Sequence, residues 1–141
     1  MQPMADADFQ ALLQFRIALR RFNRWSEEQA RGEGLTHAQH QLLLAVKGHA
    51  GADAPTIGEI AEALLLRHHS AVELVNRVQS LGFVERHRDG QDGRVVRLSL
   101  TAQGEQAIQN LTALHVAELR QLAPLLRHVV EDAELQHGPL G

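Results

Sequence analysis

RDGQDGRVVRLSLTAQG, residues 88–104, is a polar turn followed by an alternating strand. The pentapeptide DGQDG holds two glycines, and an arginine stands on each side of it, at Arg88 and Arg94. The segment RVVRLSL alternates apolar and other residues with the period of a half-buried strand. Together with FVERHR at 83–88, this pattern predicts an antiparallel hairpin whose tip carries both arginines.

The predicted hairpin must pack on the rest of the chain, because two strands alone are only marginally stable in water. On the return strand, the inward face is formed by Val96, Leu98 and Leu100. The outward face carries Val95, Arg97 and Ser99. We therefore expect the apolar face to lie on helices and the turn to project into solvent.

Two helices joined by a tight break are predicted immediately before the hairpin. Thr56 and Glu59 form a capping-box pattern, which starts a short helix through IAEALL. A break near LLRH leads to a second helix over 68–81, with Gly82 at its C-cap. One side of this helix is apolar, with Ala71, Leu74, Val75, Val78 and Leu81. The other side is polar, with His69, Glu73, Asn76 and Ser80, and Arg77 beside them. This pattern indicates a helix-turn-helix, and the added hairpin makes it a winged helix.

Longer helices are expected to flank this core. Residues 8–31 carry two neighbouring apolar stripes, and one helix with so wide an apolar surface usually packs on two bodies. The stripes are Leu12, Phe15, Leu19 and Phe22, and beside them Phe9, Leu13 and Ile17. In a short chain the second body can be another copy of itself, so the sequence predicts a homodimer.

The remaining elements follow from local signals. Thr36 repeats the capping pattern and starts a leucine-rich helix, and GHAGADAP at 48–55 is a loop. Thr101 can cap a last helical region that runs to about residue 135. Pro124 lies inside that region, where a kink or a new helix start is expected. The tail QHGPLG is expected to fray.

Composition limits the class of protein. A chain of 141 residues is long enough for one domain with a core of its own. The absence of cysteine excludes disulfides, thiolate nucleophiles and cysteine-rich zinc sites. The sequence holds no apolar run of about 18 residues, and its start is acidic where a signal peptide would be basic. A soluble, cytoplasmic protein without a membrane partner is expected.

The charge distribution, rather than the net charge, favours a nucleic-acid partner. The chain carries a formal charge of −3, which argues against such a partner. Residues 67–97 nevertheless hold six arginines against four carboxylates, a local charge of about +2, with three histidines among them. A solvated basic face is the alternative explanation.

No pattern of catalytic residues is present, so an enzyme is not expected. The sequence contains no nucleophile elbow, no phosphate-cradling glycine loop and no carboxylate pair in apolar surroundings. DGQDG lacks the ligand spacing and the closing glutamate of a calcium loop. No cofactor is implied.

Nine histidines raise the question of a metal site. His37 and His40 lie at i and i+3 on one predicted helix, and His115 can complete three nitrogen ligands for zinc. Because the sequence places no acidic partner beside them, solvent-facing histidines explain the pattern better. His68 and His69 open the helix before the hairpin, where a ring nitrogen can reach a phosphate or a base edge, or simply face solvent.

Arg94 and Asp92 form the pair that points most clearly to a function. Asp92 lies two residues before Arg94, beside the turn, so its carboxylate can hold the guanidinium and set its direction. An arginine at a projecting tip can enter a minor groove, where negative potential is concentrated. The alternative is a surface ion pair of little energetic consequence.

Residues 56–104 resemble the DNA-binding core of the MarR family of bacterial transcription regulators. The agreement lies in IGEIAEAL, HHSAVELVNRV, GFVER, DGR and LSLTAQG, and it extends over roughly 35–110. The resemblance implies a winged helix-turn-helix in an obligate dimer, with the recognition helix in the major groove and the wing arginine in the minor groove. The DNA contacts that it implies are His68, His69, Ser70, Glu73 and Arg77 on the helix and Asp92 and Arg94 on the wing. We add Arg67 and Arg88 as neighbouring cations.

This organisation predicts a single, mostly α-helical domain over 1–141 with a small β-hairpin wing. The winged helix-turn-helix occupies about 35–104, and the dimerisation helices occupy about 8–34 and 105–135. The expected function is that of a dimeric, sequence-specific regulator of a pseudo-palindromic operator in double-stranded DNA. A repressor released by a small ligand is expected, and the resemblance points to aromatic or phenolic acids.

The small-molecule effector is expected between the helical dimer module and the winged helix. The ligand-binding candidates there are Arg16, Arg20, His37 and His40. Two alternatives stay open: a winged-helix module that binds proteins, and a zinc-responsive regulator that uses His37, His40 and His115.

Overall fold

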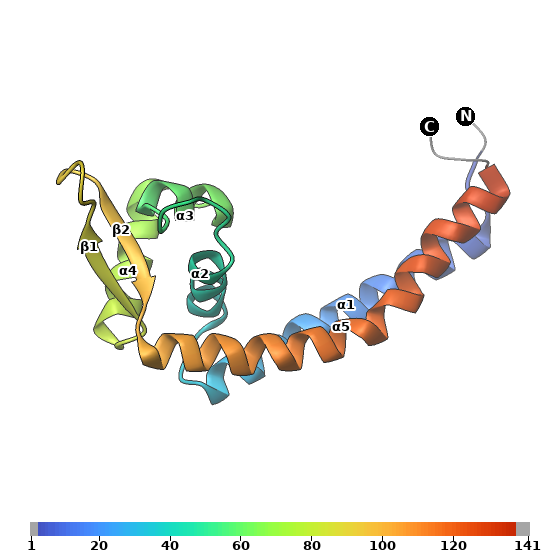
Figure 1. Ribbon diagram of the computed structural model, residues 1–141. Coiled ribbons are helices and arrows are strands. Elements are labelled where there is room, and N and C mark those ends of the chain that lie inside the picture. The colour runs from blue at the N-terminus through green and yellow to red at the C-terminus, as the bar shows by residue number, and fades with distance from the viewer. Residues whose placement is uncertain (1–2, 138–141) are drawn as a thin grey trace. The chain divides into compact units, whose positions relative to one another are not determined.

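The computed structural model describes residues 3–137, with the side chains of residues 3–131 (Figure 1). Its elements are α1 (Asp6–Gly32), α2 (His37–Lys47), α3 (Ile57–Leu64), α4 (His68–Ser80), β1 (Val84–Arg88), β2 (Val96–Leu100) and α5 (Ala102–His137). The described part is mostly helical with an antiparallel hairpin, as predicted. The chain divides into a winged-helix unit, 29–112, and a terminal-helix unit, 1–28 with 113–141, so α1 and α5 each belong to both.

Side-chain caps start α2 and α3 where the sequence predicts them. The Thr36 hydroxyl accepts a hydrogen bond from Gln39 N (3.2 Å), and the Gln39 side chain accepts one from Thr36 N (2.9 Å). Thr56 and Glu59 form the same reciprocal pair at the start of α3. Each pair satisfies two backbone donors that helix geometry leaves without an intrahelical partner.

A Schellman turn ends α4. The cap residue is Leu81, one residue before the predicted position, and Gly82 follows it with a φ of +87°. Gly82 N donates to Gln79 O (2.9 Å), and Phe83 N donates to Val78 O (3.2 Å). Glycine adopts this left-handed conformation without the steric cost of a side chain. Leu81, which the pattern assigns to the apolar face, is 47% exposed because it belongs to the cap.

The β1–β2 hairpin packs on the helices through Leu98, which is fully buried. Arg88 pairs with Val96, so the return strand begins at Val96 rather than at Arg94. Contacts run from β1 to α4 and from β2 to α2 and α3 (Figure 1). The hairpin therefore shares one core with the helices. Buried members of this core are Ala30, Leu35, Leu42, Leu43, Val46, Ile60, Val75, Val78, Phe83, Val84, Leu98, Ala107, Ile108 and Leu111.

Thr101 and Gly104 join the hairpin to α5. Thr101 N donates to Phe83 O (3.0 Å), and the Thr101 hydroxyl donates to Gly82 O (2.6 Å) and accepts from Gly104 N (3.0 Å). Gly104 is buried, and a Cβ on it would lie 2.0 Å from Phe83 O. The LTAQG sequence thus combines a helix cap with a close approach of two backbone segments.

In the terminal-helix unit, α1 and α5 lie side by side (Figure 1). A hydrogen bond of 2.6 Å joins the buried Ser26 hydroxyl to His115 Nε2. The His115 ring packs against Trp25 and Phe22, with centroids 4.9 and 5.7 Å apart. Nine other large apolar side chains of this unit are at least 38% exposed in the single chain: Phe9, Leu12, Leu13, Ile17, Leu114, Val116, Leu119, Leu126 and Val130.

α5 continues through Pro124, so the new helix start expected there is wrong. The proline removes one intrahelical hydrogen bond. The neighbouring Leu122 and Leu125 are half-buried and line a hollow together with Phe22 and Trp25 of α1, which favours a continuous helix. The predicted fraying concerns 136–141, of which residues 138–141 lie outside the described part. No helix in the described part is long and apolar enough to cross a bilayer.

Candidate nucleic-acid interface

α4 presents a polar face because its apolar side chains are used in the core, where Ala71, Val75 and Val78 are fully buried. Arg67 is the N-cap of α4 and forms no side-chain cap, so no hydrogen bond from its side chain closes the first turn. The predicted contacts at the N-cap and along α4 remain accessible, with Ser70 half-buried and the others exposed: Arg67, His68, His69, Ser70, Glu73 and Arg77.

The hairpin occupies the C-terminal part of the polar face of α4. Arg86 of β1 donates from Nη2 to Asn76 Oδ1 (2.6 Å) and from Nη1 to Gln79 Oε1. Ser80 Oγ donates to Asn76 O (2.9 Å). The sequence pattern leaves Asn76 uncommitted, whereas the structure uses it to attach the wing. The side chains best placed for a partner therefore lie toward the start of α4.

Asp89 organises the turn of the wing. Its Oδ2 accepts hydrogen bonds from Gln91 N (3.0 Å) and Asp92 N (2.9 Å), in the manner of an Asx turn. The Asp89 N–H donates to Val95 O (2.9 Å) across the loop. One carboxylate therefore holds most of the loop between the two strands.

Arg97 ties this carboxylate to the body of the winged-helix unit. Its Nε donates to Asp89 Oδ1 (2.8 Å), and its Nη1 donates to Ala54 O in the loop before α3 (2.7 Å). A longer ion pair joins Arg97 to Asp53 Oδ2 (3.9 Å). Only 19% of the Arg97 side chain is exposed, although strand alternation places it on the outward face. Sequence reasoning missed its role, because Ala54 lies 43 residues away and no local pattern links the two.

The Asp89–Arg97 pair changes the titration of both groups. The hydrogen bond from Arg97, with the smaller effects of Asp92 N and Gln91 N, lowers the pKa of Asp89 from 3.8 to about 2. The same hydrogen bond raises the pKa of Arg97. Because the folded-state pKa of Asp89 is the lower one, its contribution to stability is complete above pH 3.8 and is lost as the pH falls through about 2. The wing turn is therefore expected to stay ordered through the neutral range.

Arg97→Gln is expected to raise the pKa of Asp89 back toward 3.8, because the largest cause of its lowering is removed. The two backbone donors remain, so the return is incomplete. A carboxyl titration of Asp89 followed by NMR measures this change. Asp53→Asn is the matched control, since Asp53 is 73% exposed and meets Arg97 only at 3.9 Å. An unchanged Asp89 pKa in Arg97→Gln would show that the pair does not form in solution.

The two arginines at the wing tip have different surroundings. Arg88 Nη1 donates to Gly93 O across the loop (2.6 Å). Asp92 Oδ1 accepts from both N and Nε of Arg94 (3.0 and 3.3 Å), so the predicted contact of these two residues is present. The Arg94 side chain is 92% exposed. Arg88 therefore closes the loop, whereas the Arg94 side chain extends into solvent.

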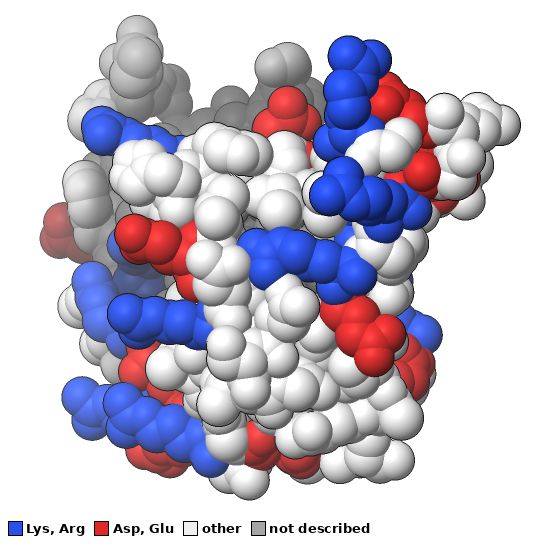
Figure 2. Space-filling model, turned by 90° about the vertical axis from the view of Figure 1, so that its left-hand side faces the viewer, with Lys and Arg blue, Asp and Glu red and all other residues white. Residues whose placement is uncertain are grey.

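Charge on the hairpin side of the molecule is mixed. Figure 2 shows Lys and Arg side chains interspersed with Asp and Glu rather than a continuous basic surface. Two carboxylates of the wing are engaged by arginines of the wing itself, Asp89 by Arg97 and Asp92 by Arg94. A polyanion that binds here would meet a few directed cations rather than a broad positive field.

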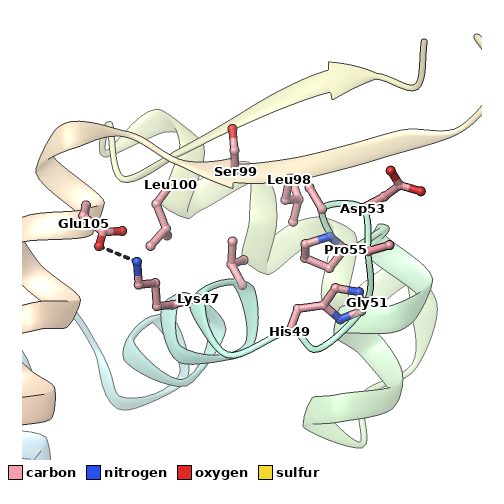
Figure 3. A pocket seen from close by; sticks show the side chains of 12 residues that line it. Lys47, His49, Gly51, Asp53, Pro55, Leu98, Ser99, Leu100 and Glu105 are labelled. Atoms are coloured by element: carbon pink, nitrogen blue, oxygen red, sulfur yellow. Dashed lines mark hydrogen bonds and ion pairs between the residues drawn. The ribbon is translucent and has the colours of Figure 1, made fainter.

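A hollow of about 330 Å³ lies between β2, the loop before α3, the end of α2 and the first turn of α5 (Figure 3). At one end, Lys47 Nζ pairs with Glu105 Oε1 (2.5 Å). At the other end, the His49 ring lies so close to Gly51 that a Cβ there would be 2.5 Å from His49 Nε2. The loop before α3 also carries Ala54 O, which accepts a hydrogen bond from Arg97. The hollow therefore adjoins the contact that attaches the wing to this loop.

The predicted ligand residues belong to both units. Arg16 and Arg20 are exposed on α1 in the terminal-helix unit. In the winged-helix unit His37 is exposed at the start of α2, whereas His40 is buried at 3% exposure. For the zinc alternative, His115 belongs to the terminal-helix unit, and the described residues contain no group of three His, Cys, Asp or Glu side chains that could hold a metal ion.

Comparison with known proteins identifies the winged helix. Residues 33–95 match the model of the MarR family, over the stretch from the end of α1 to the tip of the wing. The match covers the winged-helix segment, somewhat less than half of the chain. The MarR resemblance of the sequence and the predicted winged-helix fold are thereby confirmed.

Proteins similar to this chain include YsmB of Bacillus subtilis (strain 168), an uncharacterized HTH-type transcriptional regulator. The two are 36% identical over 67 residues, which are 48% of this chain and only 46% of YsmB. The structure is similar to that of the MarR family transcription regulator SP03579, with a TM-score of 0.68 at 27% identity over 82% of this chain and 75% of that one. It is also similar to MepR of Staphylococcus aureus in a DNA complex, with a TM-score of 0.68 at 20% identity over 79% of this chain and 81% of that one.

Proposed function

We propose that this chain is a transcription regulator that binds specific sequences in double-stranded DNA. The observation that carries the proposal is the accessible polar start of α4 beside a wing whose tip arginine is held by a carboxylate and is 92% exposed. YsmB is named as a transcriptional regulator and MepR is solved with DNA, which supports extending this activity to a chain with a similar winged helix.

In the proposed complex, α4 enters the major groove and the wing reaches the adjacent minor groove. The exposed Arg67, His68 and His69 at the start of α4 can donate to phosphates or base edges. Arg94 enters the minor groove, where negative potential is concentrated. Because Asp92 already restricts the guanidinium of Arg94, less side-chain entropy is lost on binding.

Ser70, Glu73 and Arg77 are proposed to select the bases of the operator. None of the three side chains is buried in the core, and each lies on the accessible side of α4. Replacing each by alanine is expected to relax or shift the preference at one position per half-site, at a cost of about 1–3 kcal/mol for the preferred base. Binding-site selection from random duplexes, followed by sequencing, measures this change. Ser80→Ala is the control, because Ser80 Oγ bonds to its own helix at Asn76 O. An identical consensus for all three variants would contradict base selection by α4.

We also propose a homodimer formed through the terminal-helix unit. Its exposed apolar side chains exceed the scattered hydrophobic residues of an ordinary monomer surface. A two-fold dimer would bind a pseudo-palindrome whose half-sites are about 10 base pairs apart, one turn of the double helix.

Sedimentation velocity is expected to show a dimer at micromolar concentration, because burial of these side chains requires a second copy. Leu13→Arg is expected to shift the protein toward the monomer, since Leu13 is 57% exposed in the single chain. Leu44→Arg is the matched control, because Leu44 is 43% exposed but belongs to the winged-helix unit. A stable monomer of the unaltered chain would contradict the dimer.

We further propose that the protein is a repressor and that a small aromatic acid releases it from DNA. The dimer must hold its two α4 helices about 34 Å apart, so a ligand that favours another separation weakens DNA binding without touching DNA. Arg16, Arg20 and His37 are exposed and can pair with a carboxylate, whereas the buried His40 would first have to be uncovered. Thermal-shift measurement with salicylate, with and without a chelator, tests this part. Stabilisation by zinc alone would favour the zinc alternative instead.

A further inference from the structure

Leu65 occupies a left-handed backbone position in the three-residue connection between α3 and α4. Its φ and ψ are +56° and +40°, and no other non-glycine residue of the described part has a positive φ. Leu65 N donates to Glu62 O (3.2 Å), and Leu66 N donates to Ala61 O (2.9 Å). Glycine usually fills this position after a helix, because a Cβ there crowds the backbone. The leucine is therefore locally strained.

Packing does not explain this leucine. Its side chain is 93% exposed, so it contributes almost nothing to the core. Glycine or asparagine would form the same turn with less strain. A strained backbone that carries an unpacked apolar side chain is better explained by a contact with a partner than by folding.

Leu65 lies next to the exposed residues at the start of α4 that are proposed to contact DNA. It precedes Arg67, the N-cap of α4, by two residues, and the exposed His68 and His69 follow. The N-terminal residues of a recognition helix are the ones that approach base edges in the major groove. Leu65 would therefore enter the interface together with these polar side chains.

We propose that Leu65 is a specificity-determining residue that contacts the 5-methyl group of a thymine in each half-site, an inference that rests on the proposed DNA binding. The thymine methyl is the apolar group that base edges present in the major groove. Arg67, His68 and His69 supply donors for phosphates and base acceptors around it. A protein partner would call for a wider apolar area, whereas this connection offers only Leu65 and the 37% exposed Leu66.

The test pairs a protein variant with a change in the DNA. The operator is first obtained by binding-site selection, and each of its thymines is then replaced by uracil, which lacks only the methyl group. For the unaltered protein, we expect one thymine per half-site whose replacement weakens binding about three- to fivefold, the effect of one buried methyl group. Leu65→Gly is expected to bind the thymine duplex about three- to tenfold more weakly and to be indifferent to uracil at that position.

Stability measurements separate this effect from misfolding. The melting temperature of Leu65→Gly is expected to equal that of the unaltered protein or to exceed it by about 2–4 °C, because strain is relieved. Leu65→Asn, which tolerates the same backbone conformation, should behave like the glycine variant. Leu81→Ala is the matched control, because Leu81 is 47% exposed and lies at the other end of α4, about 20 Å along the helix. This variant should change neither the affinity for the operator nor the effect of uracil.

The other possible outcomes contradict either the proposed DNA binding or only the role of Leu65. If the unaltered protein selects no duplex at all, the proposed DNA binding fails and the role of Leu65 with it. If the protein selects an operator but Leu65→Gly and Leu65→Asn bind it unchanged, only the role of Leu65 is wrong. Weaker binding by these variants with an undiminished uracil effect would likewise exclude the thymine contact.

Discussion

Gly104→Ala is expected to lower the free energy of unfolding by about 3 kcal/mol or more, because one added methyl group meets a fixed backbone. A Cβ at Gly104 would lie 2.0 Å from Phe83 O and 3.4 Å from a Leu43 methyl. Phe83 O cannot simply move away, since it accepts the hydrogen bond from Thr101 N that joins the hairpin to α5. Urea unfolding followed by circular dichroism measures the effect.

Gly32→Ala is the matched control for this substitution. Gly32 ends α1, and a Cβ built on it has nothing within 4 Å. Its free energy of unfolding is expected to stay within about 0.5 kcal/mol of the unaltered protein. If Gly104→Ala unfolds at the same urea concentration as Gly32→Ala, the close approach of α5 to the start of the hairpin is not present in solution.

Arg94→Ala is expected to weaken operator binding by about 1–3 kcal/mol while the melting temperature stays unchanged. The Arg94 side chain is 92% exposed, and Asp92 is the one partner of its guanidinium among the residues that the structure describes, so its loss removes no packing. In the proposed complex the same guanidinium enters the minor groove. Titration of a labelled selected duplex measures the loss.

Two further variants separate the effect of the positive charge of Arg94 from the effect of the orientation of its guanidinium. Arg94→Lys keeps the charge but loses the planar fork, so its affinity should lie between those of the unaltered protein and Arg94→Ala. Asp92→Ala should cost less than Arg94→Ala, because it removes only the partner that orients the guanidinium. An unchanged titration with Arg94→Ala would mean that the wing does not contact DNA.

Features that depend on a few neighbouring residues were predictable from the sequence. The capping pairs at Thr36 and Thr56 join residues three apart, and the Asp92–Arg94 contact joins residues two apart. Such contacts are determined by side-chain type and spacing along one short segment. The helix-turn-helix and the hairpin could therefore be located before any tertiary contact was known.

Features that depend on segments distant in sequence were not predictable in the same way. Strand alternation places Arg97 on an outward face, but its acceptor, Ala54 O, lies 43 residues away. The helical pattern places Asn76 on a free polar face, but Arg86 of β1 donates a hydrogen bond to its side chain. Both contacts arise only when the hairpin folds back on the helices, and alternation along one strand or helix does not show which surface is then covered.

The burial of His40 also differs from what its residue type predicts. Histidine is commonly accessible, and its spacing from His37 suggested a shared exposed face. In the structure α2 is enclosed along much of its length, with Gln39, His40, Leu42 and Leu43 all buried. A polar residue on a central helix can thus be buried without any signal in its immediate sequence.

The salt dependence of operator binding tests the central claim most directly. Each phosphate contact releases counterions, so the logarithm of the affinity should fall linearly with the logarithm of the salt concentration, with a slope of about −0.9 per contact. We expect the affinity of the unaltered protein to fall steeply with added salt. For Arg94→Ala, the slope should be shallower by about the value of one phosphate contact. Binding of the unaltered protein to a scrambled duplex should be weaker by about a thousandfold or more. An affinity that is the same for both duplexes and insensitive to salt would contradict DNA recognition by α4 and the wing, and would favour a protein partner for this surface.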